Sequence, residues 1–244
     1  MNTNIPDITQ PELAQALQRA LDNKTKPLGS LGRIEALAQR LALILGNETP
    51  ELQDPQLVVF AGDHGLAARG VSAYPSDVTW QMVENFLAGG AAVSVLARQH
   101  GIGLTVVDCG VRHDFAPRPG LVINKIAPGT ADALEGPAMS AAQCEAALAN
   151  GAALVRGLPG NALLLGEMGI GNTSAASLLL ARLAGLSVAD CTGAGTGLDA
   201  EAVQRKIGIL RQVLARHPDA RDPLAALAAF GGFEIATMVG AVLQ

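Results

Sequence analysis

The sequence predicts an α/β protein: a doubly wound, mainly parallel sheet with helices on both faces and a small helical N-terminal part. Short apolar runs of strand length alternate with longer segments whose apolar residues recur at helical spacing. Glycine-rich or polar turns follow, at 62–65, 108–113, 166–174 and 192–197. The chain is 49% hydrophobic but only 3% aromatic, which indicates a core of small aliphatic side chains. This pattern is typical of a Rossmann-like fold, where ligands bind at the carboxyl ends of the strands.

Residues 1–50 are expected to form a helical segment that packs on an α/β domain of residues 51–244. The first helix begins at a capping-box pattern in residues 9–12, with proline in its first turn. Ser30 is the expected cap of the second helix. The apolar face of that helix consists of Leu31, Ile34, Leu37, Leu41 and Ile44.

The remaining elements follow in order along the chain. The expected strands, all short and apolar, are 57–61, 104–108, 121–123 and 163–165. We expect 57–61 and 163–165 to be buried strands. The expected helices are 76–99 with a break at Gly89 and Gly90, 141–156, 175–183, 200–215, 224–230 and 233–243. Ser140 with Gln143 forms a capping box for the helix 141–156, and Asp199 can cap the helix 200–215.

Composition excludes several classes of function. The net charge is −5 and basic residues form no cluster, so nucleic acid and anionic membranes are not expected partners. The sequence shows neither a signal peptide nor an apolar run of ~18 residues. Three widely spaced cysteines, Cys109, Cys144 and Cys191, indicate a reducing compartment, and we expect a cytoplasmic protein. Without a CxxC pair, a structural zinc site is not expected.

The most informative motif is the turn after the strand 163–165, where Gly166, Glu167, Gly169 and Gly171 precede an apolar helix. Glycines let backbone N–H groups surround an anion, and the helix adds its positive N-terminal end. A carboxylate is unfavourable beside an anion, so Glu167 points to chemistry rather than to phosphate binding alone. The alternative is a tight strand-to-helix connection with an incidental glutamate.

The turn 62–65 offers a metal or acid–base site as one interpretation. The residues of suitable type are Asp63, His64, Asp108, Cys109, His113 and Asp114. No HxxxH or HxH spacing supports this. In the alternative, Asp63 accepts backbone hydrogen bonds and His64 shapes a pocket.

Two further groups of residues are candidates for ligand binding. Tyr74 and Trp80, each the only residue of its type, lie near a group that can hold a flat apolar ligand: Gln81, Met82, Asn85 and Phe86. Helix–core packing explains the same group equally well. Lys206 can reach a phosphate held by the turn 193–197, although a solvated lysine is the usual case. That turn is neither a Walker motif nor a GxGxxG motif.

A set of longer motifs carries a family resemblance. They are 26–35, 60–65, 72–75, 78–82, 85–86, 89–92, 166–173, 193–197 and 230–236. From about Leu28 to the C-terminus, they resemble in order the nicotinate-nucleotide–dimethylbenzimidazole phosphoribosyltransferase family, usually called CobT. The resemblance implies a cytoplasmic homodimer with a doubly wound α/β fold and no redox cofactor.

The resemblance also implies a reaction. Nicotinate mononucleotide gives its 5-phosphoribosyl group to 5,6-dimethylbenzimidazole, which releases nicotinate and forms α-ribazole 5′-phosphate, the lower ligand of cobalamin. The attacking benzimidazole must lose a proton, and a carboxylate with a raised pKa suits that task. The leaving nicotinate departs from a cationic nucleotide, so positioning and charge placement matter more than an acid.

Site residues are carried over from the same motifs. The benzimidazole wall is expected at Ser72, Tyr74, Gln81 and Met82. The ribose-phosphate and nicotinate side is expected at Glu167, Gly169, Gly171, Asn172 and Thr173. The phosphate contacts are expected at Gly193, Gly195, Thr196, Gly197 and Lys206.

The chain departs from the family pattern at one point. Family members continue past the position of Gln244, and that stretch holds the glutamate considered their general base. No acidic residue follows Glu234, so we expect a C-terminally shortened form in which Glu167 takes the catalytic role. The rival interpretations are a non-catalytic nucleotide or benzimidazole binder and a metal-dependent phosphohydrolase using Asp63, His64 and Asp108.

Overall fold

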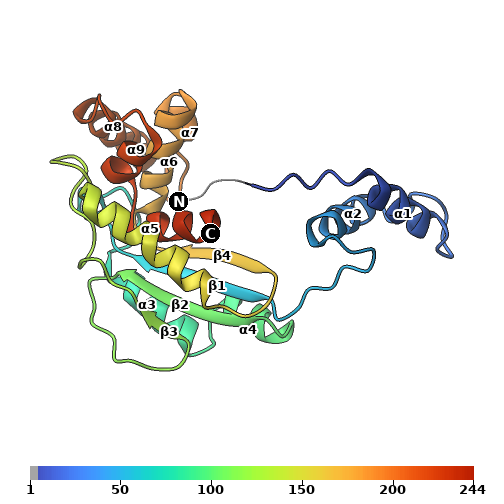
Figure 1. Cartoon of the computed structure of the whole chain (residues 1–244). Coiled ribbons are helices and arrows are strands. Elements are labelled where there is room, and N and C mark those ends of the chain that lie inside the picture. The colour runs from blue at the N-terminus through green and yellow to red at the C-terminus, as the bar shows by residue number, and fades with distance from the viewer. Residues whose placement is uncertain (1–4) are drawn as a thin grey trace. The chain divides into compact units, whose positions relative to one another are not determined.

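The computed structural model describes residues 5–244, and the chain divides into two compact units (Figure 1). One unit extends to Gln53 and the other runs from Asp54 to Gln244. The predicted α/β fold is confirmed in the larger unit, where four parallel strands are flanked by helices. Within the described residues, no helix is long and apolar enough to cross a membrane.

The smaller unit contains α1 (Pro11–Asp22) and α2 (Arg33–Leu45), which contact each other. Both helices were predicted, but both predicted caps are wrong. Gln10 is the N-cap of α1, because its carbonyl oxygen accepts the first helical hydrogen bond from the Ala14 N–H at 2.9 Å, while Thr9 lies in a turn where its N–H donates to Asp7 Oδ1 at 2.8 Å. Gly32, at φ +53°, is the N-cap of α2, and Ser30 lies in the preceding turn.

The sheet consists of β1 (Gln56–Gly62), β2 (Gly103–Gly110), β3 (Leu121–Ile123) and β4 (Leu163–Met168). The order is β3-β2-β1-β4 and every pair is parallel. β4 is therefore an edge strand, and its Leu164 and Leu165 are 40% and 39% exposed. The prediction of a buried strand there is wrong, because an apolar run does not reveal how many neighbours a strand has.

Side chains of β1 alternate between two apolar layers. Val58 and Phe60 pack against α5 (Ala141–Arg156) and α10 (Phe233–Leu243). Val59 and Ala61 face the opposite side, where α3 (Asp77–Leu87) and α4 (Ala92–Gln99) cover the sheet (Figure 1). Helices on both faces confirm the doubly wound arrangement.

Glycines allow α5 and α10 to cross at very short range. A Cβ on Gly151 of α5 would overlap the carbonyl oxygen of Thr237, and a Cβ on Gly240 of α10 would overlap that of Leu148. This close approach fixes α10 beneath the sheet, so the first turn of α10 lies near the carboxyl end of β1.

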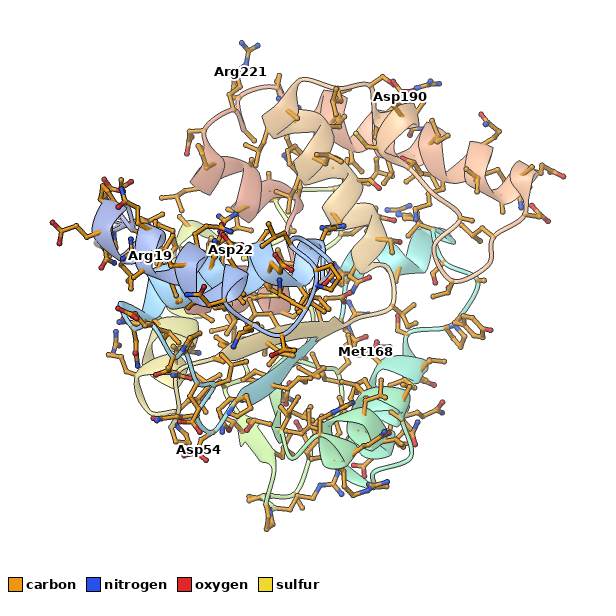
Figure 2. The ribbon with its side chains drawn as sticks, turned by 90° about the vertical axis from the view of Figure 1, so that its right-hand side faces the viewer. Arg19, Asp22, Asp54, Met168, Asp190 and Arg221 are labelled. Atoms are coloured by element: carbon orange, nitrogen blue, oxygen red, sulfur yellow. The ribbon has the colours of Figure 1, made fainter. Side chains whose placement is uncertain are left out.

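A third apolar cluster joins the remaining helices. They are α6 (Asn172–Ala184), α7 (Val188–Cys191), α8 (Ala200–Arg216) and α9 (Pro223–Phe230). Its fully buried members include Leu178 of α6 and Leu210 of α8. α7, whose Asp190 is labelled in Figure 2, was not predicted, because four residues are too few to show helical periodicity. The short 3₁₀ helix η1 (Gly65–Arg69) was missed for the same reason.

Two predicted caps are confirmed. Ser140 Oγ accepts the Gln143 N–H at 3.2 Å while Gln143 Oε1 accepts the Ser140 N–H at 2.9 Å, which completes the capping box of α5. Asp199 Oδ1 accepts the Ala202 N–H at 2.8 Å and caps α8. Both motifs depend on residues within one turn, so the sequence alone reveals them.

Candidate active site at the carboxyl ends of β1 and β4

The turn after β1 and the turn after β4 lie side by side because these two strands pair in parallel. Phe60 is opposite Glu167, and Ala61 is opposite Met168, the last residue of β4, labelled in Figure 2. A Cβ on Gly169 would overlap the carbonyl oxygen of Gly62, so only glycine permits this approach. The prediction that the turn 62–65 and the glycines 169–171 lie at the carboxyl ends of strands is confirmed, but the turn 192–197 follows α7 (Val188–Cys191) rather than a strand.

The turn from β4 into α6 is held from two sides. Gly171 is the N-cap of α6 at φ +96°, a conformation that favours glycine. The Ile170 N–H donates to Thr79 Oγ1 at 3.1 Å, and Thr79 is fully buried in α3. Both Gly169 and Gly171 are buried, so the structure gives them a packing role.

Glu167 is the next-to-last residue of β4, so the prediction that it lies in a turn directly after residue 165 is wrong: the strand continues to Met168 because it pairs with β1 up to Ala61. Glu167 Oε2 accepts a hydrogen bond from the side-chain amide of Asn172. The side chain reaches solvent, yet desolvation by the surrounding protein raises its pKa. The negative charge of Glu234 raises that pKa further, and the positive charge of His64 acts in the opposite direction. A carboxyl group with a raised pKa is suited to accept a proton near neutral pH.

Lys206 is a fully buried cation. Its Nζ donates a hydrogen bond of 2.9 Å to Thr173 Oγ1, a neutral acceptor. Burial lowers the pKa of its ammonium group, and no acidic neighbour contributes to that shift. A buried ammonium without a carboxylate partner favours an anionic ligand, because the ligand would supply the missing counter-charge.

The glycine-rich loop 193–197 passes beside this lysine. A Cβ on Gly195, where φ is +57°, would lie 3.3 Å from Thr173 Oγ1 and 3.7 Å from Lys206 Nζ. Gly193, Thr196 and Gly197 are exposed around it. The structure therefore brings Gly195 and Lys206, two of the expected phosphate contacts, together with Thr173 of the expected ribose-phosphate side, and a phosphate-binding role stays a prediction.

A hollow of about 220 Å³ lies between α10 on one side and Glu167 of β4 with the first turns of α6 on the other. It is lined by Glu167, Asn172, Thr173, Ala176, Leu179, Ile235 and Met238. A larger hollow of about 420 Å³ lies between the start of α5 and the α8–α9 connection. We assign the site to the smaller one, because ligands of parallel α/β folds bind at the carboxyl ends of strands.

The expected benzimidazole wall is mostly solvent-exposed. Tyr74 is 52% exposed, Gln81 is exposed and Ser72 is half-buried. Met82 packs in the apolar cluster on the α3 side of the sheet, which also contains Trp80. Helix–core packing therefore describes these two side chains, and a ligand-binding role for the wall stays a prediction.

Asp63, just after β1, and Asp108, near the end of β2, bind backbone groups. Asp63 Oδ2 accepts the Arg112 N–H at 2.8 Å, and Asp108 Oδ1 accepts the Val111 N–H at 2.8 Å. Among residues 5–244, no three His, Cys, Asp or Glu side chains gather as metal ligands. His113 instead stacks on Trp80, with ring centroids 4.8 Å apart. The interpretation in which Asp63 binds backbone groups is the one the structure supports.

A buried pair escaped sequence reasoning. His64 Nε2 and Glu234 Oε1 are 2.6 Å apart, and the two residues are 3% and 0% exposed. Glu234 is the only charged residue in 223–244, and that signal marks it as a residue with a specific partner. The partner itself lies 170 positions away, beyond the reach of any local pattern.

A parallel α/β fold with a buried lysine, a glycine-rich loop and a carboxyl group of raised pKa is typical of enzymes that act on small anionic ligands. Residues 7–244 match a family described as Phosphoribosyltransferase. The chain belongs to the nicotinate-nucleotide–dimethylbenzimidazole phosphoribosyltransferase family, as the relatives below show.

The relatives are similar over nearly the whole chain. The nicotinate-nucleotide–dimethylbenzimidazole phosphoribosyltransferase of Variovorax paradoxus (strain S110) is 72% identical over 99% of this chain and 69% of its own length. The protein of that name from Dechloromonas aromatica (strain RCB) is 56% identical over 98% of this chain and 70% of its own. The crystal structure of CobT from Thermus thermophilus superposes with a TM-score of 0.88 at 41% identity, covering 95% of this chain and 70% of that one.

Proposed function

We propose that this chain transfers the 5-phosphoribosyl group of nicotinate mononucleotide to 5,6-dimethylbenzimidazole, giving α-ribazole 5′-phosphate and nicotinate in the assembly of cobalamin. Its relatives are named for this pair of substrates. The observation that carries the proposal is the buried Lys206 beside Thr173 and Gly195, next to the hollow that Glu167 lines.

The phosphate of the nucleotide binds at Lys206, Thr173 and the loop 193–197. Its negative charge compensates the buried ammonium group, and backbone N–H groups of the loop and of the first turn of α6 add donors. The ribose then lies toward Asn172 and Glu167. Gly169 and Gly171 contribute by shaping this turn.

A benzimidazole ring nitrogen attacks the anomeric carbon of the ribose. As this carbon–nitrogen bond forms, the bond to the nicotinate ring nitrogen breaks. The electron pair of the breaking bond returns to the pyridinium nitrogen. The ring therefore leaves as nicotinate, with a neutral pyridine nitrogen and its carboxylate group. The other benzimidazole nitrogen loses its proton to the carboxylate of Glu167. No acid is needed for the leaving group, so positioning of the two substrates carries most of the catalysis.

The benzimidazole is proposed to lie against Ser72, Tyr74, Gln81 and Met82. An aromatic and a thioether side chain suit a flat apolar ring, and Gln81 and Ser72 offer hydrogen bonds to its nitrogen atoms.

A homodimer is also proposed. The exposed apolar side chains of α6, with Leu180 and Leu183 each 50% exposed, support an association surface. The cytoplasmic location stays a prediction.

A product assay tests the reaction. The chain is mixed with nicotinate mononucleotide and 5,6-dimethylbenzimidazole, and α-ribazole 5′-phosphate is sought by mass spectrometry. We expect product, together with calorimetric binding of the nucleotide. Binding without product would favour the non-catalytic form, and the absence of both would overturn the proposal.

A further inference from the structure

The pair formed by His64 and Glu234 joins the turn after β1 to α10, one of the elements that line the proposed site. His64 follows β1, and Glu234 lies in the first turn of α10. The 2.6 Å contact between His64 Nε2 and Glu234 Oε1 is enclosed by protein. Glu234 directly precedes Ile235, which lines the hollow together with Glu167 of β4 and residues of α6.

His64 packs against three glycines, and its ring needs the space left by the missing Cβ of one of them, Gly232. A Cβ on Gly169 would lie 3.4 Å from ring atoms Cδ2 and Nε2, and one on Gly171 would lie 3.5 Å from His64 Cβ. A Cβ on Gly232, just before α10, would lie 2.5 Å from ring atom Cε1. The ring therefore lies between the β4–α6 turn, which follows Glu167, and the start of α10.

The charges around the ring favour a fixed orientation. Burial opposes protonation of His64, but the carboxylate of Glu234 outweighs it, with Asp63 and Glu167 adding to the effect, and the pKa of His64 is raised. The second oxygen of Glu234, Oε2, is buried and makes no hydrogen bond to the described residues. Replacing a buried ion pair with apolar residues is often neutral or stabilising, so stability alone is a weak reason for this arrangement.

We infer that His64 and Glu234 are a positioning pair for the proposed transfer reaction: Glu234 orients the imidazole ring, and the ring sets the distance between the β4–α6 turn and α10. Neither residue lines the hollow, so neither is a catalytic residue. The pair acts through Glu167 and Asn172, whose places depend on where Gly169 and Gly171 meet the ring. This inference rests on the proposed function for its kinetic test only.

The first test is the Glu234→Gln variant, which keeps the shape of the side chain and removes its charge. We expect kcat to fall at least about tenfold, because small displacements of reacting groups reduce rates by up to about 10²-fold. The KM for nicotinate mononucleotide should change less than about threefold, because Lys206 of α8 and the loop 193–197 hold the phosphate from elements outside residues 169–173. In a cycle with His64→Gln, the double variant should lose no more kcat than the more impaired single variant.

Ser94→Ala is the matched control. Ser94 is a buried residue of α4 whose hydroxyl donates to the Phe86 carbonyl oxygen at 2.9 Å, and it does not line the hollow. It should leave kcat unchanged even if it lowers stability. Additive losses in the cycle, or a Glu234→Gln kcat within about twofold of the unmodified chain, would overturn the inference.

Hydrogen–deuterium exchange provides a readout that needs no turnover. In Glu234→Gln, the amides of residues 169–173 should exchange faster than in the unmodified chain, while those of β1 and β2 should not. Unchanged exchange in this turn, or faster exchange throughout the larger unit, would contradict a positioning role. If the unmodified chain made no product, the proposed function would fail while this measurement would still decide on the pair.

Discussion

The ammonium group of Lys206 donates a 2.9 Å hydrogen bond to the hydroxyl group of Thr173, and the lysine side chain is completely buried. The two residues come from α8 and the first turn of α6, and Gly195 brings the loop between these helices close to both. A cation held by a neutral hydroxyl in this way is available to an incoming phosphate. The predictions below begin from this relationship.

Lys206→Met should weaken the binding of nicotinate mononucleotide at least about tenfold, because a charge-assisted phosphate contact is lost. Stability should be unchanged or increased, since an uncompensated buried charge is removed. Isothermal calorimetry and thermal unfolding measure the two effects. Arg205→Met is the control, because Arg205 is exposed and pairs with Glu201 on the same helix. Equal weakening by both variants would contradict a specific role for Lys206.

Glu167→Gln should reduce kcat by about 10²-fold or more, because the neutral amide cannot take the benzimidazole proton. Binding of the nucleotide should be retained, since the phosphate contacts are untouched. Product formation by mass spectrometry and calorimetry separate these effects. Glu145→Gln, at an exposed position of α5, removes an equal charge and should be silent. Full turnover by Glu167→Gln would show that another group takes the proton.

The pH dependence of kcat/KM should show an acidic limb above the ordinary range of a glutamate. Glu167 is a base only when ionised, so the rate rises as pH increases through its pKa. That pKa is raised by desolvation and by Glu234, with His64 opposing. Initial rates from about pH 4 to about pH 8 measure the limb. A limb near the unperturbed value of about 4.3, or the same limb in residual turnover of Glu167→Gln, would refute the assignment.

Gly151→Ala should destabilise the larger unit by roughly 2 kcal/mol or more, because the new Cβ would overlap the Thr237 carbonyl oxygen where α5 crosses α10. Gly208→Ala on α8 is the matched control. A Cβ there meets nothing within 4 Å, so the same substitution should stabilise by about 0.5–1 kcal/mol through helix propensity. Urea unfolding measures both. Similar effects of the two variants would mean that the crossing can relax.

Local features of this chain were predictable because they depend on near neighbours. The capping box at Ser140 and the cap at Asp199 need only residues within one helical turn. The strands and long helices follow from apolar periodicity. The predicted caps at Thr9 and Ser30 were wrong because each residue lies in a turn before its helix. Thr9 belongs to a turn closed by Asp7, and the helix after Ser30 begins at Gly32, whose φ is +53°.

The candidate site was only partly predictable. Glu167, Thr173 and Lys206 stand in recognisable motifs, and the structure brings the latter two together. That Leu164 and Leu165 are exposed depends on the strand order, which places β4 at the edge of the sheet. Strand order is a property of the assembled sheet rather than of any single run.

By itself, the sequence determined the alternation of strands and helices, the glycine turns and the candidate residues of the site, because backbone propensity and apolar period act over a few residues. Only the tertiary structure decided that Lys206 is buried with no carboxylate partner among residues 5–244, and that His64 meets Glu234 across 170 positions. Burial and long-range pairing arise when separate elements pack. They change the charge and position of a side chain in ways that its neighbours in sequence do not encode.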